Sequence, residues 1–347
     1  QALLLRLCKG YNKEETMPRT VTRRLLCCAL LSASTALAAP FSPANAQDSF
    51  PVRPMKLVVP YAAGGGTDAI ARLVAQGVGE KLGQSLIVEN NGSAGGNVAT
   101  QQAAKAEPDG YTLLMANQGP MVVNPHLFKN VKTDPLTAFD PITLITAAPL
   151  VVVVPKNSPH KTINELIEHA QKNPGKLTYG SAGNGSASHL ATVLLAQVTK
   201  FEATHVPYRG AGPALNDLLG ERMDFMVTTV PSVLGLIESG DVRVLAVTSK
   251  GKTKKFPEIP SVAESGWPTY EATAWYGFAV PKGTPKDIAD KIRKATIETI
   301  TMGIVRERLE NEGAEPIGNS PDDFAAMMKT ESIRWSEILK KASISVD

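Results

Sequence analysis

Short apolar runs alternate with longer segments of helical periodicity from residue 55 onwards. This alternation is typical of β-α-β units and predicts an α/β fold with a mainly parallel sheet. The predicted strands are Met55–Pro60, Leu86–Glu89, Tyr111–Ala116, Leu150–Val154, Leu177–Gly180, Phe225–Val230, Val242–Thr248 and Trp275–Val280. The predicted helices are Asp68–Leu82, Asn97–Lys105, Ile163–Lys172, Ser186–Thr199 and Ala211–Gly220, followed by a helical portion from Pro285 to Lys341 whose last helix begins at Pro321. The consecutive valines 151–154 indicate a strand covered on both faces.

A strand, a glycine-rich loop and a helix start occur in Leu57–Asp68 and again in Leu177–Ser186. Thr67 and Ser186 stand where an N-cap is expected. A helix N-terminus presents unpaired N–H groups and a positive dipole end, so it attracts anions without Lys or Arg. Two such units predict two α/β lobes that grip a carboxylate or small dianion, although tight strand-to-helix turns alone would also explain the glycines. A third glycine loop, Asn91–Asn97, also leads into a predicted helix.

The first 46 residues have the features of a leader. Met17 is followed by a basic segment with Arg23 and Arg24, then by an apolar run and the Ala44–Ala46 motif, as in a secretory signal peptide. The apolar run is too short for a membrane span, which needs about 20 residues. We therefore expect residues 1–46 to be upstream residues plus a signal peptide (Met17–Ala46), cleaved near Ala46, and the product to be exported.

The charge and the cysteine content of the chain exclude several classes of function. The chain has 43% hydrophobic and 20% charged residues, as in globular proteins, and a net charge of +3. Loss of residues 1–46 would leave 30 basic and 31 acidic residues, which does not indicate nucleic-acid binding. All three cysteines, Cys8, Cys27 and Cys28, lie in the predicted leader, so disulfides, a thiol nucleophile and a cysteine-bound metal are not expected in the mature chain.

Catalytic and cofactor motifs are sparse. The glycine loops match neither the P-loop nor the dinucleotide-binding pattern, and no H-E-x-x-H or G-x-S-x-G motif occurs, so we expect no nucleotide cofactor and no metal. Ser181 and His189 could form a nucleophile and base, but no acidic partner is evident in the sequence. The lysine run 250–255 is interpreted as solvated surface, and Trp275 is the tryptophan expected to wall a pocket.

Several stretches resemble the extracytoplasmic solute receptors of the tripartite tricarboxylate transporter class, the Bug or TctC-like receptors. The matching segments are Val59–Asp68, Glu107–Leu114, Tyr179–Ser186, His189–Ala191, His205–Gly210, Leu245–Thr248 and Pro281–Pro285. The resemblance covers essentially all of residues 50–345, in order. It implies a two-lobed periplasmic-binding-protein fold (type II-like) with a two-segment hinge near residues 147 and 272. Lobe 1 would comprise residues 47–147 and 272–347, and lobe 2 residues 148–271.

The resemblance also implies a binding site for a small carboxylate between the lobes, formed by loops such as Ala62–Asp68 and Ser181–Ser186. The expected ligand-binding residues are Tyr61, Ala62, Gly64, Gly65, Gly66, Thr67, Asp68, Ser181, Gly183, Gly185, Ser186, His189, Thr228, Thr229 and Trp275. Two positions depart from the family pattern: Ala63 replaces a usual proline, and Thr228 stands where many relatives have Asp. If that Asp meets the amino group of amino-acid ligands, Thr228 favours an uncharged or dicarboxylate ligand here.

The function expected from the resemblance is that of a monomeric, non-enzymatic receptor that delivers its ligand to a tripartite tricarboxylate-type membrane transporter. Two alternatives are a component that presents the ligand to a membrane sensor, and an exported hydrolase that uses Ser181 and His189.

Overall fold

The computed structural model describes residues 50–341, and the predicted leader lies outside these residues. The strands are β1 (Met55–Val59), β2 (Leu86–Asn90), β3 (Thr112–Asn117), β4 (Phe139–Pro155), β5 (Thr178–Ser181), β6 (Thr204–Pro207), β7 (Phe225–Thr229), β8 (Val242–Val247), β9 (Thr273–Pro281) and β10 (Glu315–Pro316). The helices are α2 (Gly66–Leu82), α3 (Asn97–Ala104), α4 (Asn124–Leu127), α5 (Pro135–Ala138), α6 (Ile163–Lys172), α7 (Ala187–Thr199), α8 (Ala211–Leu219), α9 (Val230–Glu238), α10 (Lys286–Thr301), α11 (Gly303–Asn311) and α12 (Pro321–Lys341), with short turns η1 (Ser93–Gly96) and η2 (Gly119–Val123). The predicted strands and helices are therefore confirmed, and α4, α5, α9, β6 and β10 are additional.

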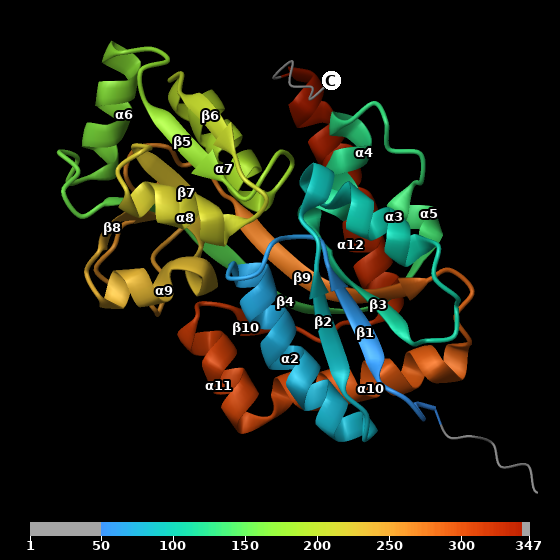
Figure 1. The fold of residues 1–347 in the computed structure, drawn as a ribbon. Helices are drawn as coiled ribbons and strands as arrows, with labels where there is room; N and C mark the ends of the chain where they lie inside the picture. The colour runs from blue at the N-terminus through green and yellow to red at the C-terminus, as the bar shows by residue number, and fades with distance from the viewer. Residues whose placement is uncertain (1–49, 342–347) are drawn as a thin grey trace, which may run out of the picture. The chain divides into compact units, whose positions relative to one another are not determined.

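The strands form one curled, mixed sheet with the order β2-β1-β3-β9-β4-β7-β5-β6, in which β8 and β10 also pair with β4 (Figure 1). The α/β prediction is confirmed. The strands joined by helices pair in parallel, namely β1 with β2 and β3, and β5 with β6 and β7. The parallel prediction fails for β4 and β9, which pair with each other and with their other neighbours in antiparallel fashion.

Strand β4 belongs to two parts of the sheet. Its residues Phe139–Pro149 pair with β9, whereas Leu150–Val153 pair with β7 and Val151–Pro155 with β8. We call the part that contains β1, β2, β3, β9 and β10 sheet A, and the part that contains β5, β6, β7 and β8 sheet B. A single strand thus runs continuously from one part to the other.

Helices cover both faces of each part. In sheet A, α2 and α10 share one apolar cluster with Leu57 and Phe278, while α3 and α12 share another with Val58 and Ala279. In sheet B, Val151 and Val153 pack with α8 and α9, whereas Val152 and Val154 lie in the cluster that includes α6 and α7. The consecutive valines are fully buried because each face of their strand is covered.

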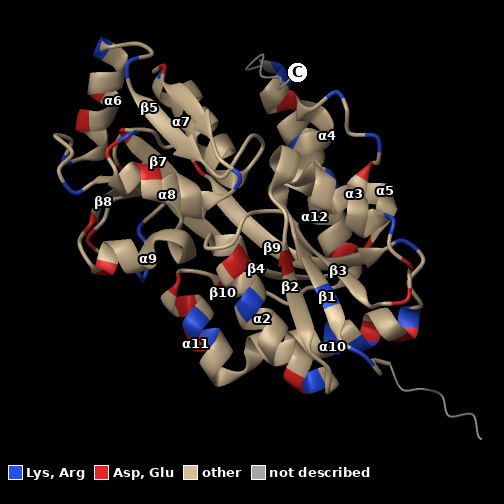
Figure 2. Cartoon of the chain, viewed as in Figure 1, with Lys and Arg blue, Asp and Glu red and all other residues tan. Residues whose placement is uncertain are grey.

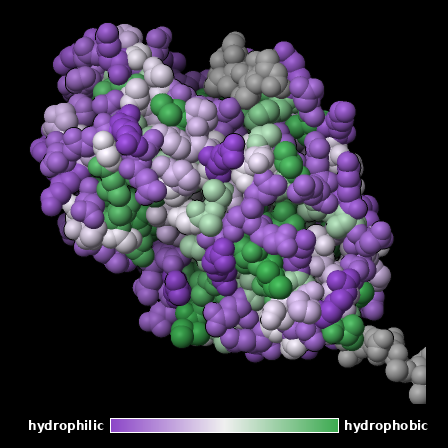
Figure 3. Space-filling model, in the orientation of Figure 1, coloured by the Kyte–Doolittle hydropathy of each residue, from purple (hydrophilic) through white to green (hydrophobic). Residues whose placement is uncertain are grey.

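The face of the molecule shown in Figure 3 is mainly hydrophilic, with hydrophobic residues in separate patches. Within residues 50–341, no helix is both long and apolar enough to span a membrane. Lys, Arg, Asp and Glu lie on outer helices such as α6, α10 and α11 and on the connecting loops (Figure 2).

Candidate functional site

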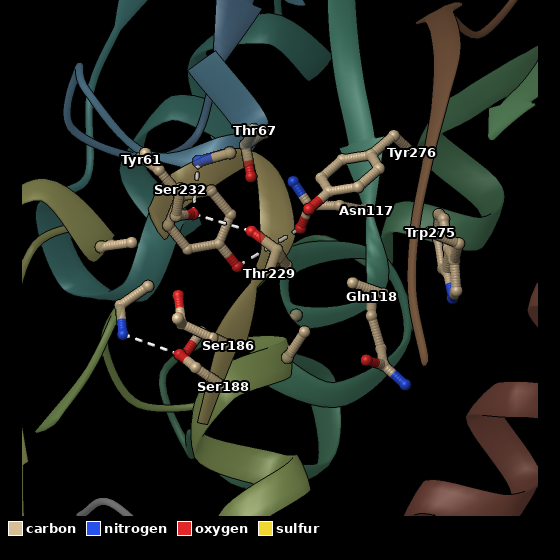
Figure 4. Close-up of a pocket in the computed structure, with 18 residues that line it drawn as sticks. Tyr61, Thr67, Asn117, Gln118, Ser186, Ser188, Thr229, Ser232, Trp275 and Tyr276 are labelled. Carbon is tan, nitrogen blue, oxygen red and sulfur yellow. Dashed lines mark hydrogen bonds between the residues drawn. The ribbon is translucent and has the colours of Figure 1, made fainter. Parts of the chain in front are cut away.

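A cavity of about 40 Å³ lies where the first turns of α2, α7, α8 and α9 meet the end of β3 and the start of β9 (Figure 4). That volume holds a few water-sized groups, since one water needs about 10–15 Å³ by this measure. The cavity is lined by Tyr61, Gly65, Gly66, Thr67, Asn117, Gln118, Gly119, Ala182, Ser186, Ala187, Ser188, Ala211, Thr228, Thr229, Ser232, Ala274, Trp275 and Tyr276. None of these residues is charged.

The first glycine loop reaches from sheet A to the helices of sheet B. The backbone N–H of Ala62 donates to the carbonyl oxygen of Arg209 (2.9 Å), and that of Gly66 donates to Ser232 Oγ (2.7 Å). A Cβ on Gly66 would lie 2.3 Å from Thr229 Oγ1 and 2.9 Å from Ser232 Oγ. The glycine therefore allows this close approach.

The prediction that Thr67 caps α2 is wrong. Gly65 is the N-cap residue, and no side chain of the cap position bonds the helix start. Ser232 from α9 satisfies the N–H of Gly66 instead. The helix start is thus capped from across the cavity, which leaves the Thr67 side chain free to line it.

Asp68 supports the first loop from behind and does not line the cavity. Its carboxylate accepts hydrogen bonds from the Gly64 N–H (3.0 Å), Arg72 Nε (3.1 Å) and Asn90 Nδ2 (3.0 Å). Burial opposes ionisation, but these hydrogen bonds and the Arg72 charge together hold the pKa of Asp68 below its usual value. Asp68 therefore fixes the loop and is ionised at neutral pH.

The second glycine loop is held by serine hydroxyls. Ser186 is the N-cap of α7, as predicted, and its Oγ accepts from the His189 N–H (3.3 Å) while it donates to the Gly183 carbonyl oxygen (2.6 Å). Ser188 Oγ accepts from the Ala182 N–H (2.8 Å). Both serines line the cavity, so the same hydroxyls shape the loop and face the binding space.

Two stacked histidines lie beneath this loop. The rings of His189 and His205 are 4.2 Å apart and nearly parallel, and Tyr179 stacks on His205 at 4.8 Å. His189 Nδ1 accepts from the Gly185 N–H (3.2 Å), and His205 Nε2 lies 2.6 Å from Ser181 Oγ. Burial lowers the pKa of His189 to about 3, with a further contribution from His205, and burial lowers the pKa of His205 to about 4. Both rings are neutral at pH 7.

The hydrolase alternative required Ser181 to pair with His189. The fully buried Ser181 instead hydrogen-bonds His205, and neither Ser181 nor His189 lines the cavity. The geometry therefore provides no exposed nucleophile with an adjacent base at this position. No group of three or more His, Asp and Glu residues within 50–341 is arranged to hold a metal ion.

Hydroxyl and amide groups form the polar wall of the cavity. Tyr61 OH donates to Asn117 Oδ1 (3.3 Å), and the Tyr276 hydroxyl is hydrogen-bonded with the side chains of Thr229 and Thr67 (Figure 4). Burial raises the pKa of Tyr276 to about 12, so its hydroxyl remains a donor at neutral pH. Trp275 lies apart from this hydroxyl cluster in Figure 4, and its ring packs edge-on against Phe324 at 5.6 Å.

Eight of the fifteen expected ligand-binding residues line the cavity, namely Tyr61, Gly65, Gly66, Thr67, Ser186, Thr228, Thr229 and Trp275. The other seven, Ala62, Gly64, Asp68, Ser181, Gly183, Gly185 and His189, do not line it. These seven residues belong to the two glycine loops or to the first turns of α2 and α7. Some of them, such as Asp68 and His189, bond the loop backbone. Sequence reasoning missed the polar lining residues Asn117, Gln118, Ser188, Ser232 and Tyr276, of which only Ser188 lies near a recognised glycine loop.

The solved structures that are similar to this chain include three whose names state the protein or its ligand. The periplasmic binding protein BugD is 38% identical, with a TM-score of 0.82 over 85% of this chain and 99% of that one. Rpa4515 of Rhodopseudomonas palustris, solved with adipate, is 34% identical, with a TM-score of 0.83 over 85% and 99%. MatC of the same organism, with bound malate, is 32% identical, with a TM-score of 0.80 over 84% and 100%.

The family model described as the tripartite tricarboxylate transporter family receptor matches residues 70–344. This match covers most of the chain, and the periplasmic-binding-protein fold agrees with it. The chain belongs to the tripartite tricarboxylate transporter receptor family, the TctC and Bug group of periplasmic solute-binding receptors.

Proposed function

We propose that this protein is an exported receptor that binds a compact dicarboxylate in the cavity and delivers it to a tripartite tricarboxylate-type membrane transporter. The observation that carries the proposal is the cavity wall, where helix N-termini and hydroxyl groups from sheets A and B converge without any charged side chain. Such donors suit a carboxylate, because N–H and O–H groups bond its oxygens directly. Adipate and malate in the related structures support this ligand class.

The lining residues also indicate which carboxylates to expect. No Asp or Glu lines the cavity, so an ammonium group of an amino acid would lack an anionic partner there. Thr228, which is 1% exposed, offers a neutral hydroxyl in the cavity wall.

In this proposal the receptor closes by a hinge between two lobes, residues 47–147 with 272–347 and residues 148–271. The exchange of β4 partners between Pro149 and Leu150 supports one hinge segment. The contacts of Thr248 support a second hinge segment near residue 272 that lies close to the first. Thr248 Oγ1 donates to the Ala272 carbonyl oxygen (2.7 Å) and accepts from the Leu150 N–H (2.6 Å). A ligand that contacts both lobes would favour the closed state.

The remaining elements of the proposal concern the form of the protein. We infer that the mature receptor is a periplasmic monomer from which the leader is cleaved near Ala46, and that it acts by binding alone. Mass spectrometry of the exported protein would test the cleavage site.

Thermal unfolding against a panel of mono-, di- and tricarboxylates and amino acids tests the ligand class. At a hundredfold excess over Kd, the correct ligand stabilises the folded state by about 2.7 kcal/mol and raises Tm by several degrees. The Gly66→Ala variant should lose this shift because its Cβ would contact Thr229, whereas Gly303→Ala, with no atom within 4 Å of the added Cβ, should keep it. Stabilisation by amino acids alone would contradict the dicarboxylate proposal.

A further inference from the structure

A second, larger recess of about 940 Å³ lies between α10, α11 and β10 on one side and the Ser249–Lys255 segment, which follows β8, on the other. We call it the basic groove. This volume is near the upper end of the range for small-molecule sites, about 300–1,000 Å³. It shares no lining residue with the carboxylate cavity. The groove is thus a separate feature of the molecule.

Positive charge in the groove is concentrated on one wall. Lys250, Lys252, Lys254 and Lys255 line it from the segment after β8. Lys250 and Lys255 have only long contacts to carboxylates, 3.7 Å to Glu271 and 4.0 Å to Glu238. Lys252 has an electrostatic interaction with Glu264. Lys250 is exposed and Lys255 is half-buried, and at these separations the carboxylates neutralise the wall weakly, because surface ion pairs contribute little.

The opposite wall carries one basic and two acidic side chains, Arg306, Glu310 and Glu315, and is partly apolar. Arg306 lies 2.7 Å from Glu310, and Glu315 also acts on it electrostatically. Beside them, Ile297, Pro316 and Ile317 line the groove, and Ile317 is 45% exposed. An occupant of the groove would meet a row of ammonium groups on one side and isoleucine and proline surface on the other.

The groove lies next to the segments where the sheets join. Ala147 and Pro149 of β4 line it, and they pair with Trp275 and Thr273 of β9. The lysine segment starts directly after Thr248, which bonds both Leu150 and Ala272. A bound segment would therefore contact elements of sheets A and B at once.

We infer that the basic groove is a docking site for an acidic, partly apolar segment of a protein partner. Charge complementarity with the lysine wall selects carboxylate side chains, and the Ile297 and Ile317 surface selects interspersed apolar side chains. A nucleic acid or an anionic lipid surface would satisfy the lysines but would leave this apolar wall unpaired. The inference is independent of the ligand in the carboxylate cavity.

Fluorescence anisotropy with a labelled synthetic peptide, in which glutamates alternate with leucines, tests this site on the full protein. We expect the peptide to bind at low salt, more weakly as salt screens the charges, and about tenfold more weakly to the Lys252→Gln/Lys254→Gln variant. The variant Lys172→Gln/Lys176→Gln removes the same charge from exposed positions outside the groove and should bind as the original protein does. Unchanged thermal unfolding would show that both variants fold.

A second set of probes distinguishes the proposed partner from other occupants. The Ile317→Asn variant should also bind the peptide less tightly, and a peptide with glutamine in place of glutamate should not bind. The inference is overturned if the glutamate peptide fails to bind, if the glutamine peptide binds equally well, or if the groove and control variants lose equal affinity. Displacement of the peptide by a short single-stranded DNA or by anionic lipid vesicles at equal charge concentration would also overturn it.

Discussion

The backbone N–H of Gly66, in the first turn of α2, donates a 2.7 Å hydrogen bond to Ser232 Oγ in the first turn of α9. Helix α2 packs on sheet A and α9 on sheet B, so this bond joins the two parts of the molecule beside the cavity. Thr229 Oγ1 lies 2.7 Å from Ser232 Oγ. Both side chains line the cavity, so this hydrogen bond is part of the cavity wall.

Ser232→Ala should weaken ligand binding without unfolding the protein. The variant loses the Gly66–Ser232 bond between the two parts of the molecule, together with the Ser232 contact to Thr229. One hydrogen bond of this kind is worth about 1 kcal/mol or roughly fivefold in Kd. Isothermal titration calorimetry with the carboxylate identified by the thermal screen measures the effect. Ser239→Ala, at the exposed C-terminal end of the same helix, is the matched control and should leave Kd unchanged. Equal affinities for both variants would show that the Gly66–Ser232 bond does not contribute to closure.

Asp68→Asn should destabilise the protein because Asp68 holds the Gly64 N–H, Arg72 and Asn90 together. Loss of the charge-assisted bonds should cost about 1–3 kcal/mol of unfolding free energy at pH 7, measured by urea titration. Since the pKa of Asp68 is lowered in the folded state, its contribution is complete above the unfolded value of about 3.9 and is lost as pH falls below it. The difference between variant and original should persist at pH 5 and shrink below about pH 4. A difference that grows in acid would contradict this role.

The sequence predicted the alternating strands and helices well because their apolar periodicity is local. It missed Phe139–Pro149 of β4, where Pro141, Thr143, Thr146 and Pro149 interrupt the apolar run. This segment forms a strand because β9 and β10 pair with it. Such pairing depends on the tertiary structure and cannot be predicted from the local sequence. The antiparallel direction of β4 and β9 was missed for the same reason.

The glycine loops of the site were also predictable, but their capping was not. Ser186 caps its own helix, so a local rule applies. The Gly66 N–H is capped by Ser232, which is 166 residues away in the chain. Tyr276 and Asn117 likewise face the cavity from β9 and β3, and neither lies in a motif. Local sequence patterns do not find the residues that only the tertiary fold brings to the cavity.

Mild acid should destabilise the protein through the stacked pair of the buried His189 and the half-buried His205. Their folded pKa values of about 3 and about 4 lie below the unfolded value of about 6.5, so the unfolded state binds more protons between these limits. Stability is therefore complete above about pH 6.5 and decreases as pH falls from there towards 4. Thermal unfolding at pH 7.5 and pH 5 should show a lower Tm at pH 5, and His205→Gln should reduce this difference.

The control for the histidine pair is His169→Gln, an exposed histidine on α6 that packs against His160 and lies outside the stack. It should keep the part of the pH dependence that the His189–His205 stack sets. If His205→Gln and the original protein lose Tm equally between the two pH values, the neutral His189–His205 stack does not set the acid sensitivity.

Thr228→Asp should change the ligand preference of the cavity. Thr228 is almost fully buried and lines the binding space, so a carboxylate there would repel a dicarboxylate and would offer a partner to an ammonium group. We expect dicarboxylate affinity to fall by about tenfold or more, while glutamate or aspartate gains affinity, as measured by calorimetry. Thr228→Asn is the neutral control of the same size as Asp and should not gain amino-acid binding. If Thr228→Asn and Thr228→Asp shift the preference alike, side-chain size and not charge at this position selects the ligand.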